Sequence, residues 1–158
     1  MAITSTIITD GIAGTIIGTV KLNGTTLIDT LTYDNGVPDV SFVSTSDVTL
    51  SITDFLALLQ FYIAFNNVII ASIFTPSQNQ YTPFNGIASL ISNNGTDLFL
   101  LIEDLAGENI FNIDCTYPSG TILVGGRSPD TSMSYAEWIY CINTISGFRN
   151  FVLNAYNL

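Results

Sequence analysis

The sequence predicts a single domain of the α+β class, mainly β, with antiparallel strands and two helices. Short runs rich in Thr, Val and Ile recur along the chain, separated by turn-forming pairs such as Asn23-Gly24. Two longer apolar segments, at about 53–66 and 134–146, begin with helix-capping residues. The length of 158 residues fits one compact domain spanning residues 1–158. These patterns are compatible with open antiparallel sheets, a sandwich or a barrel.

The first fifty residues are expected to form strands joined by tight turns. Runs rich in β-branched residues occupy 15–22 and 25–33, on either side of the hairpin signal Asn23-Gly24. Shorter apolar runs follow at 40–43 and 48–50. This arrangement predicts a meander of antiparallel strands.

Glycines at positions 11, 14 and 18 have the spacing of a small-residue helix contact. Their neighbours are Thr and Ile, which favour strands over helices. We therefore expect these glycines to mark bulges or places where another part of the chain approaches a strand closely.

The first helix is expected at about 53–66. Ser51 or Thr53 can cap it, and Gln60 is the only polar side chain between residues 55 and 65. Asn66-Asn67 is expected to end the helix, and residues 68–74 are expected to form a strand. A helix that is apolar on every side must be covered on every side. We expect a neighbouring subunit to supply part of that cover.

The apolar stretch 55–74 is long enough to be tested as a membrane span. Gln60 and Asn66-Asn67 interrupt it, and no Lys or Arg flanks it to set an orientation. We therefore expect no membrane span and interpret the segment as part of a protein core.

The second half of the chain repeats the strand-rich pattern after a linker-like stretch at 75–86. This stretch is a possible boundary between two halves. Strands are expected at 87–92, 97–102, 110–116 and 121–124.

The second helix carries the strongest local signals. Ser134 and Glu137 have the spacing of a capping box, and an apolar stripe runs from Tyr135 to Ile145. Gly147 is a typical residue just beyond a helix C-terminus, so we expect a final strand at 148–156.

The order of strands, capped helix and strand thus occurs twice, at about 11–74 and 86–156. Two similar strand-helix-strand halves are one interpretation. The alternative is that turn and cap patterns recur by chance in a β-rich chain of biased composition.

The charge pattern excludes several functions. Thirteen acidic and three basic residues give a net charge of −10, there is no His, and residues 22–126 contain no Lys or Arg. Nucleic acids and anionic membrane surfaces are bound through clustered Lys and Arg. We therefore expect no direct binding to nucleic acid or to an anionic membrane surface. Without His, the chain has no Ser-His-Asp triad and no His-ligated metal.

Carboxylates are the remaining candidates for catalysis. Glu103 and Asp104 are adjacent, so in a strand they face opposite sides, and no spacing requires Glu108 or Asp114 to approach them. Solvated acids at strand ends explain these residues, and we expect no enzyme activity.

Metal and phosphate sites are also poorly supported. Asp34, Asp39 and Asp47 lack the ligand series and distal Glu of a calcium loop, although calcium stays open as an alternative. The loop around Arg127 lacks the pattern of a phosphate-binding loop. We therefore expect no cofactor.

Cys115 and Cys141 are expected to be buried free thiols, because the N-terminus lacks the charged start and apolar run of a secretory signal. A disulfide would require an oxidising compartment. No C-x-x-C spacing suggests zinc or redox chemistry.

Together these observations favour a non-enzymatic structural subunit that is made in the cytoplasm. Its expected partners are copies of itself and other structural subunits, in a virion or other assembled particle such as a phage tail tube, decoration or capsid-associated component. The alternative is a small carbohydrate- or ligand-binding module, with calcium-dependent binding left open. The interface candidates are Phe55, Leu58, Phe61, Tyr62, Phe65, Arg127, Trp138 and Arg149.

Overall fold

The computed structural model describes residues 2–34, 39–44, 48–72, 87–94, 97–104, 109–116, 121–125 and 131–155. These residues form strands and two helices, which confirms the predicted mainly-β α+β class. The elements are β1 (Ile3–Asp10), β2 (Thr15–Leu22), β3 (Thr26–Asp34), β4 (Asp39–Ser44), β5 (Val48–Ser51), α1 (Ile52–Ala71), β6 (Ile87–Asn94), β7 (Asp97–Asp104), β8 (Asn109–Thr116), β9 (Thr121–Gly125), β10 (Thr131–Ser134) and α2 (Tyr135–Ala155).

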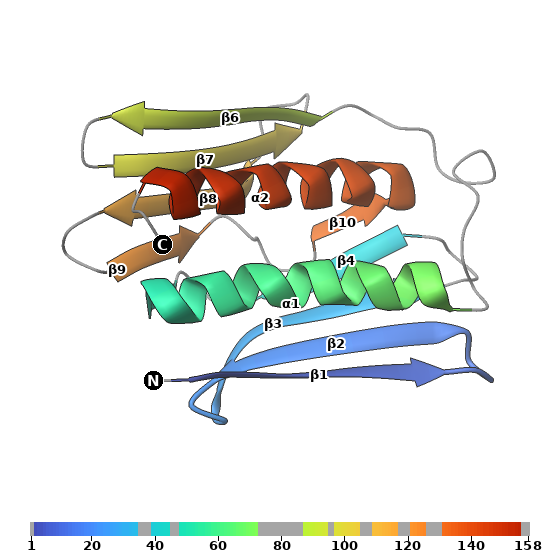
Figure 1. Ribbon diagram of the computed structural model, residues 1–158. Coiled ribbons are helices and arrows are strands. Elements are labelled where there is room, and N and C mark those ends of the chain that lie inside the picture. The colour runs from blue at the N-terminus through green and yellow to red at the C-terminus, as the bar shows by residue number, and fades with distance from the viewer. Residues whose placement is uncertain are drawn as a thin grey trace.

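The strands form two five-stranded antiparallel sheets. The first sheet has the order β1-β2-β3-β4-β10, and the second has the order β5-β9-β8-β7-β6. Each sheet therefore contains four consecutive strands from one half of the chain and one short strand from the other half. β5 pairs with β9, and β10 pairs with β4. Strands β1 and β6 lie at opposite ends of the strand layer (Figure 1).

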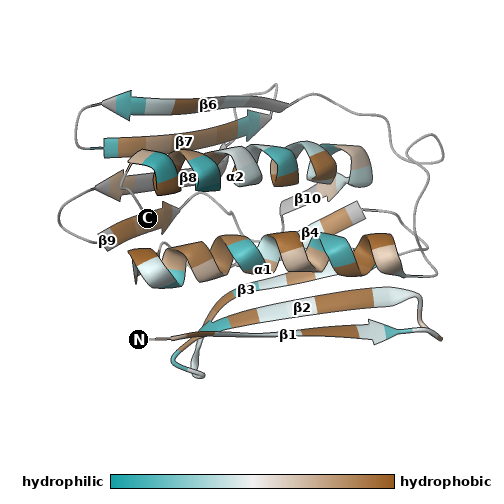
Figure 2. Ribbon diagram, in the orientation of Figure 1, coloured by the Kyte–Doolittle hydropathy of each residue, from teal (hydrophilic) through white to brown (hydrophobic). Residues whose placement is uncertain are grey.

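Both helices lie on the same side of the two sheets (Figure 1), and each contacts strands of both sheets. Helix α1 contacts β1 and β2 of the first sheet and β5 and β9 of the second, and α2 contacts β4 and β10 of the first sheet and β6 and β7 of the second. The helices run in opposite directions and contact each other. The strands alternate hydrophobic and more polar residues, whereas α1 is hydrophobic along most of its length (Figure 2). The core therefore lies between the helix pair and the sheets.

The two halves of the chain repeat the same elements with nearly the same lengths. Even an irregularity repeats: the β2–β3 register shifts between Val20 and Lys21, and the β7–β8 register shifts between Ile102 and Glu103, at the corresponding point of each hairpin. With antiparallel helices and reciprocal exchange of β5 and β10, the halves are related by an approximate twofold axis. Each half is five strands followed by a helix, which corrects the predicted strand-helix-strand order.

Helix α1 is longer than predicted. It was expected to end at Asn66-Asn67, but it continues to Ala71, so the strand predicted at 68–74 is wrong over its described part. The Asn66 amide does not break the helix because it is buried and its Oδ1 accepts a hydrogen bond from Trp138 Nε1 at 3.2 Å. Instead the helix ends at Ser72, whose backbone N–H and hydroxyl both donate to the Ile69 carbonyl.

Helix α2 also continues beyond its predicted end, to Ala155, so the strand predicted at 148–156 is wrong over its described part. Gly147 lies on the exposed side of the helix, with open space around its Cα. Phe148 and Val152 extend the buried stripe by two further turns. Their burial offsets the roughly 1 kcal/mol that a glycine costs inside a helix.

The helix starts agree with the sequence. Ser51, one of the two predicted caps, accepts a hydrogen bond from the Asp54 backbone N–H at 3.2 Å. Ser134 accepts from the Glu137 N–H at 3.2 Å, and Glu137 Oε1 accepts from the Ser134 N–H at 3.0 Å. The predicted capping box is confirmed.

Gly18 marks a close approach, as predicted for this group of glycines. It lies on the helix side of β2, where a Cβ atom would be 2.8 Å from Phe65 Cδ2 and 3.0 Å from Phe61 Cζ. Only a residue without a side chain allows α1 to lie this close to the sheet.

The two cysteines behave as predicted. Cys115 in β8 and Cys141 in α2 are both buried thiols that form no disulfide with each other.

Candidate interaction surface

The predicted interface residues on the helices are inside the fold. Phe55, Leu58, Tyr62 and Phe65 are fully buried, as is Trp138, and Phe61 is only 3% exposed. The chain itself covers this part of the apolar surface of α1, with β2 on one side and α2 on another, whereas Ile70 of α1 is half exposed. The predicted apolar residues on the two helices therefore lie in the core of the single chain.

The two predicted arginines have different outcomes. Arg127 lies outside the described residues. Arg149 is half-buried in α2, and its Nε atom has no hydrogen-bond partner among the residues that the structure describes.

Strand register defines the outer face of the first sheet, which is the side opposite the helices. Gly18 faces α1, so its neighbours Ile17 and Thr19 face outward. The register then places the following described residues on this outer face: Thr4, Thr6, Ile8, Asp10, Thr15, Ile17, Thr19, Lys21, Thr30, Thr32, Asp34, Ser41 and Val43.

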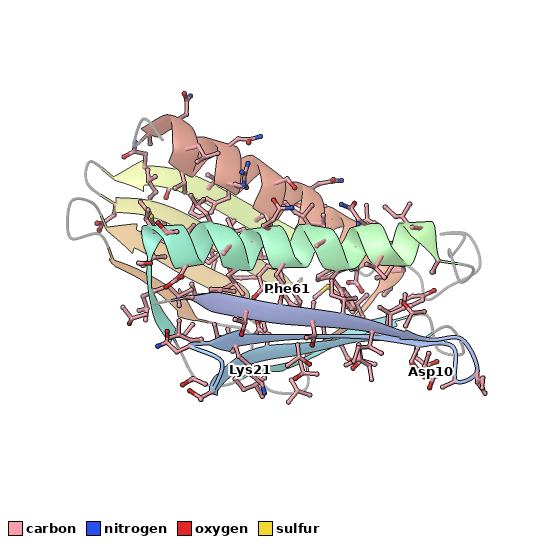
Figure 3. The ribbon with its side chains drawn as sticks, turned by 60° about the horizontal axis from the view of Figure 1, so that its bottom comes forward. Asp10, Lys21 and Phe61 are labelled. Carbon is pink, nitrogen blue, oxygen red and sulfur yellow. The ribbon has the colours of Figure 1, made fainter. Side chains whose placement is uncertain are left out.

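Charge on this outer face is confined to its two ends. Lys21 lies at one end. Asp10 and Asp34 lie at the other end, on either side of Thr15, with which both are paired. Figure 3 shows Lys21 and Asp10 at opposite ends of the β1–β2 hairpin, with Phe61 on the helix side. The rows between these ends carry only threonine, serine and aliphatic side chains.

Large apolar side chains are exposed on this uncharged region. Ile8 is 66% exposed and lies directly opposite Ile17, which is 42% exposed. Val43 is half exposed on the same face, and Ile12 is fully exposed in the turn between β1 and β2. Scattered exposed apolar residues are ordinary, but adjacent ones on an uncharged region indicate an interaction surface.

A hollow lies at the Lys21 end of the same sheet. Its volume is about 400 Å³, and it is lined by Thr4, Ser5, Thr6, Thr19, Lys21 and Gly24. The cross-strand neighbours of Lys21 are Thr4 and Leu27, which carry no charge. Hydroxyls and an ammonium group are donors suited to a small polar or anionic ligand.

The exposed positions of the two helices are uncharged as well. Those with polar functional groups on α1 are Thr53, Gln60 and Asn67, and on α2 they are amides: Asn143, Asn150 and Asn154. The helices' acidic residues, Asp54 and Glu137, are buried. Among the described residues, the exposed positions of the helix side therefore present amide groups and no charged side chain, and the charged Arg149 is half-buried.

The outer face of the second sheet carries both apolar and acidic side chains. Phe99 and Leu101 on β7 are half-buried there, and Leu123 on β9 is exposed. Glu103 lies on the same face at the end of β7, whereas the side chains of Asp104, Glu108 and Asp114 lie outside the described part. A facing carboxylate pair is therefore not defined by the described side chains.

Metal ligands do not cluster in the part of the chain that the structure describes, where no group of three or more His, Cys, Asp or Glu residues is suited to hold an ion. Asp34 ends β3, while Asp39's side chain and Asp47 lie outside that part. Among the described helices, α1 is long and apolar enough to cross a membrane by length and composition, and half of its apolar window is buried within the fold.

Sequence reasoning missed both the uncharged outer face and the hollow. The relevant signal was the spacing of two residues between Thr4 and Thr6 and between Thr30 and Thr32, which puts their hydroxyls on one side of the sheet. Comparison with known proteins gave no matching family model, no similar curated protein and no similar solved structure.

Proposed function

We propose that this protein is a non-enzymatic structural subunit that assembles with copies of itself into a homo-oligomer or a larger particle. The observation that carries the proposal is the outer face of the first sheet, where Ile8, Ile17 and Val43 are exposed among uncharged hydroxyl side chains. Burying such a face gains about 25 cal/mol per Å² of apolar surface. It also avoids the cost of removing charges from water.

The helix side supports the same proposal. Its exposed polar groups are amides and hydroxyls, which can form hydrogen bonds across an interface without an ion pair. A chain with three cations among 158 residues can form few intersubunit salt bridges. Assembly of this protein would therefore depend on apolar burial and neutral hydrogen bonds.

We further propose a virion, such as a phage tail tube or capsid-associated layer, as the particle. Its walls are built from many copies of small subunits, and a cation-poor subunit does not hold nucleic acid by its phosphates. Mass spectrometry of purified particles from the source of this sequence tests that location. Detection of the chain only in soluble, particle-free fractions would contradict it.

Native mass measurement of the purified chain tests the assembly. The wild type is expected to be oligomeric at micromolar concentration, and Ile17→Lys is expected to shift it towards the monomer by placing a charge in the outer face. Leu123→Lys makes the same change at a similarly exposed position of β9 in the second sheet and serves as the matched control. A wild-type monomer under these conditions would refute the proposal.

The hollow around Lys21 favours a second candidate function, a carbohydrate- or ligand-binding module. An anionic sugar would match its hydroxyl groups and its ammonium group. Titration with glucuronic acid, with glucose as the neutral control, is expected to show saturable binding that Lys21→Gln abolishes. Equal responses in wild type and Lys21→Gln would exclude the hollow as the site.

A further inference from the structure

The two ends of the strand layer are open edges of equal length. β1 ends the first sheet and β6 ends the second, and each strand has 8 residues. Within the described residues, no other strand pairs with the far side of either one. An open edge presents unpaired backbone N–H and C=O groups, which favour pairing with another strand.

Hydrogen bonding at the start of β1 identifies the groups on its open edge. The Asn23 backbone N–H donates to the Ala2 carbonyl at 2.8 Å, so the backbone of Ala2 points towards β2. In an antiparallel pair, this direction alternates from one residue to the next. The backbone groups of Ile3, Ser5, Ile7 and Thr9 therefore point away from β2, towards the open edge.

Neither edge carries the features that usually block strand pairing. Residues 3–9 of β1 and all of β6 contain no charged residue and no proline. The register shifts of the two hairpins lie between β2 and β3 and between β7 and β8, so they do not distort the outermost pairs. Long, uncharged and regular edge strands are uncommon on monomers because they promote association.

The side chains beside the two edges are also compatible. Ile3 and Ile7 lie on the helix side of β1 and are half-buried. On β6, the Ser89 hydroxyl lies 3.0 Å from the Tyr140 hydroxyl of α2, so Ser89 and Ile91 lie on the helix side too. Ile91 is 37% exposed. Pairing the edges with their helix sides together would bring Ile7 and Ile91 onto one face.

We propose that β1 of one copy pairs antiparallel with β6 of the next copy, so that the strand layer continues from subunit to subunit. This inference rests on the proposed self-assembly and adds an edge-to-edge contact to the contact proposed for the outer face of the first sheet. The approximate twofold axis places β1 and β6 at equivalent positions in the two halves of the chain. The proposed contact nevertheless joins two different strands, β1 of one copy and β6 of the next. Such a head-to-tail contact produces a closed ring if the rotation closes and a filament if it does not.

A proline at the open edge separates this inference from self-assembly in general. Ser5→Pro removes an N–H that points away from β2, leaving the β1–β2 ladder intact, and edge strands tolerate such a proline. Ser5→Ala is the matched control. We expect native mass measurements to show the oligomer for wild type and Ser5→Ala, and the monomer for Ser5→Pro.

The outcomes of this experiment are distinct. A monomeric wild type would refute the proposed function and this inference with it. An oligomer that persists in Ser5→Pro, with an unchanged mass, would refute the edge pairing and leave the proposed function standing. The thermal unfolding of Ser5→Pro is expected to match that of Ser5→Ala at a dilution where both are monomeric.

Cross-linking identifies which edges meet. Ile7→Cys and Ile91→Cys variants, purified separately and mixed, are expected to form a dimer of one copy of each with a short bis-maleimide reagent. Each variant alone is expected to form none, since Cys115 and Cys141 are buried. Cross-linking of Ile7→Cys alone would indicate pairing of β1 with β1, and would overturn the inference.

Discussion

The ring of Phe55 in α1 packs edge-on against the ring of Phe148 in α2, with centroids 6.1 Å apart at 85°. A second pair repeats this geometry at the other end of the helix pair, where Phe65 meets Trp138 at 6.0 Å and 86°. Counted from the two caps, Phe55 corresponds to Trp138 and Phe65 to Phe148. The internal symmetry of the fold therefore extends to side-chain contacts.

The symmetric aromatic pairs differ in one polar contact, which gives a first prediction. Trp138→Phe keeps an aromatic ring but removes the N–H that donates to buried Asn66 Oδ1. Leaving a buried acceptor without this donor is expected to lower the free energy of unfolding by about 1–3 kcal/mol. Denaturant unfolding measures the change. Phe55→Leu tests the corresponding position, where no such hydrogen bond is lost.

A second prediction concerns the close approach at Gly18. Gly18→Ala would place a Cβ 2.8 Å from the buried ring of Phe65, so α1 would have to shift away from β2. Overpacking of this kind costs about 1–3 kcal/mol. Gly11→Ala is the control, because its Cβ would meet no heavy atom within 4 Å. Equal unfolding midpoints for the two variants would contradict the packing described here.

A third prediction concerns the buried hydrogen bond between the Tyr62 hydroxyl and the Asp29 carboxylate. Tyr62→Phe removes a donor to a buried acidic group and is expected to cost about 1.5–3 kcal/mol of unfolding free energy. Tyr140→Phe removes a hydroxyl from a half-exposed tyrosine and is expected to have a much smaller effect. Thermal and chemical unfolding of both variants provides the comparison.

A fourth prediction follows from the environment of Cys141. Burial, assisted by the negative charge of Glu137, raises the pKa of its thiol from 9.0 to about 12. The native state therefore holds this proton more tightly than the unfolded state. Stability from this group is complete below pH 9 and is lost as the pH rises towards 12. Cys141→Ala is expected to lose less stability than wild type between pH 8 and pH 10.5 in denaturant titrations.

Thiol labelling gives an independent check on the same residue. At pH 7.5 the native protein is expected to react with Ellman's reagent at neither cysteine, and both are expected to react once denaturant is added. Rapid labelling of Cys141 in the native protein would show that α2 opens far more readily than its packing implies.

Local signals in the sequence were reliable wherever the controlling interaction is local. The Ser134–Glu137 capping box, the Asn23-Gly24 hairpin turn and the strand alternation act over a few residues, and each is present in the structure. Asn66 and Gly147 have the local pattern of helix ends, but both helices continue through them because of contacts with residues distant in the sequence. Trp138 satisfies the Asn66 amide, and burial of the residues after Gly147 sustains α2.

Interface residues on α1 were harder to predict because they depend on which sides of this helix are covered by the chain itself. An all-round apolar helix requires cover, and the sequence does not show whether its own strands or a second subunit provide it. Here β2 approaches closely enough at Gly18, and α2 covers another side. The pairing of β5 with β9 and of β10 with β4 likewise joins residues that are distant in the sequence, so no local pattern predicts it.

These pairings have a consequence for how the molecule unfolds. β5 leads directly into α1 but pairs in the second sheet, and β10 leads into α2 but pairs in the first. Separation of the two halves would therefore remove one strand from each sheet. Subglobal opening of one half is therefore expensive. Slow amide hydrogen exchange is expected to report one cooperative unit, with equal opening free energies for the central residues of β3 and β8.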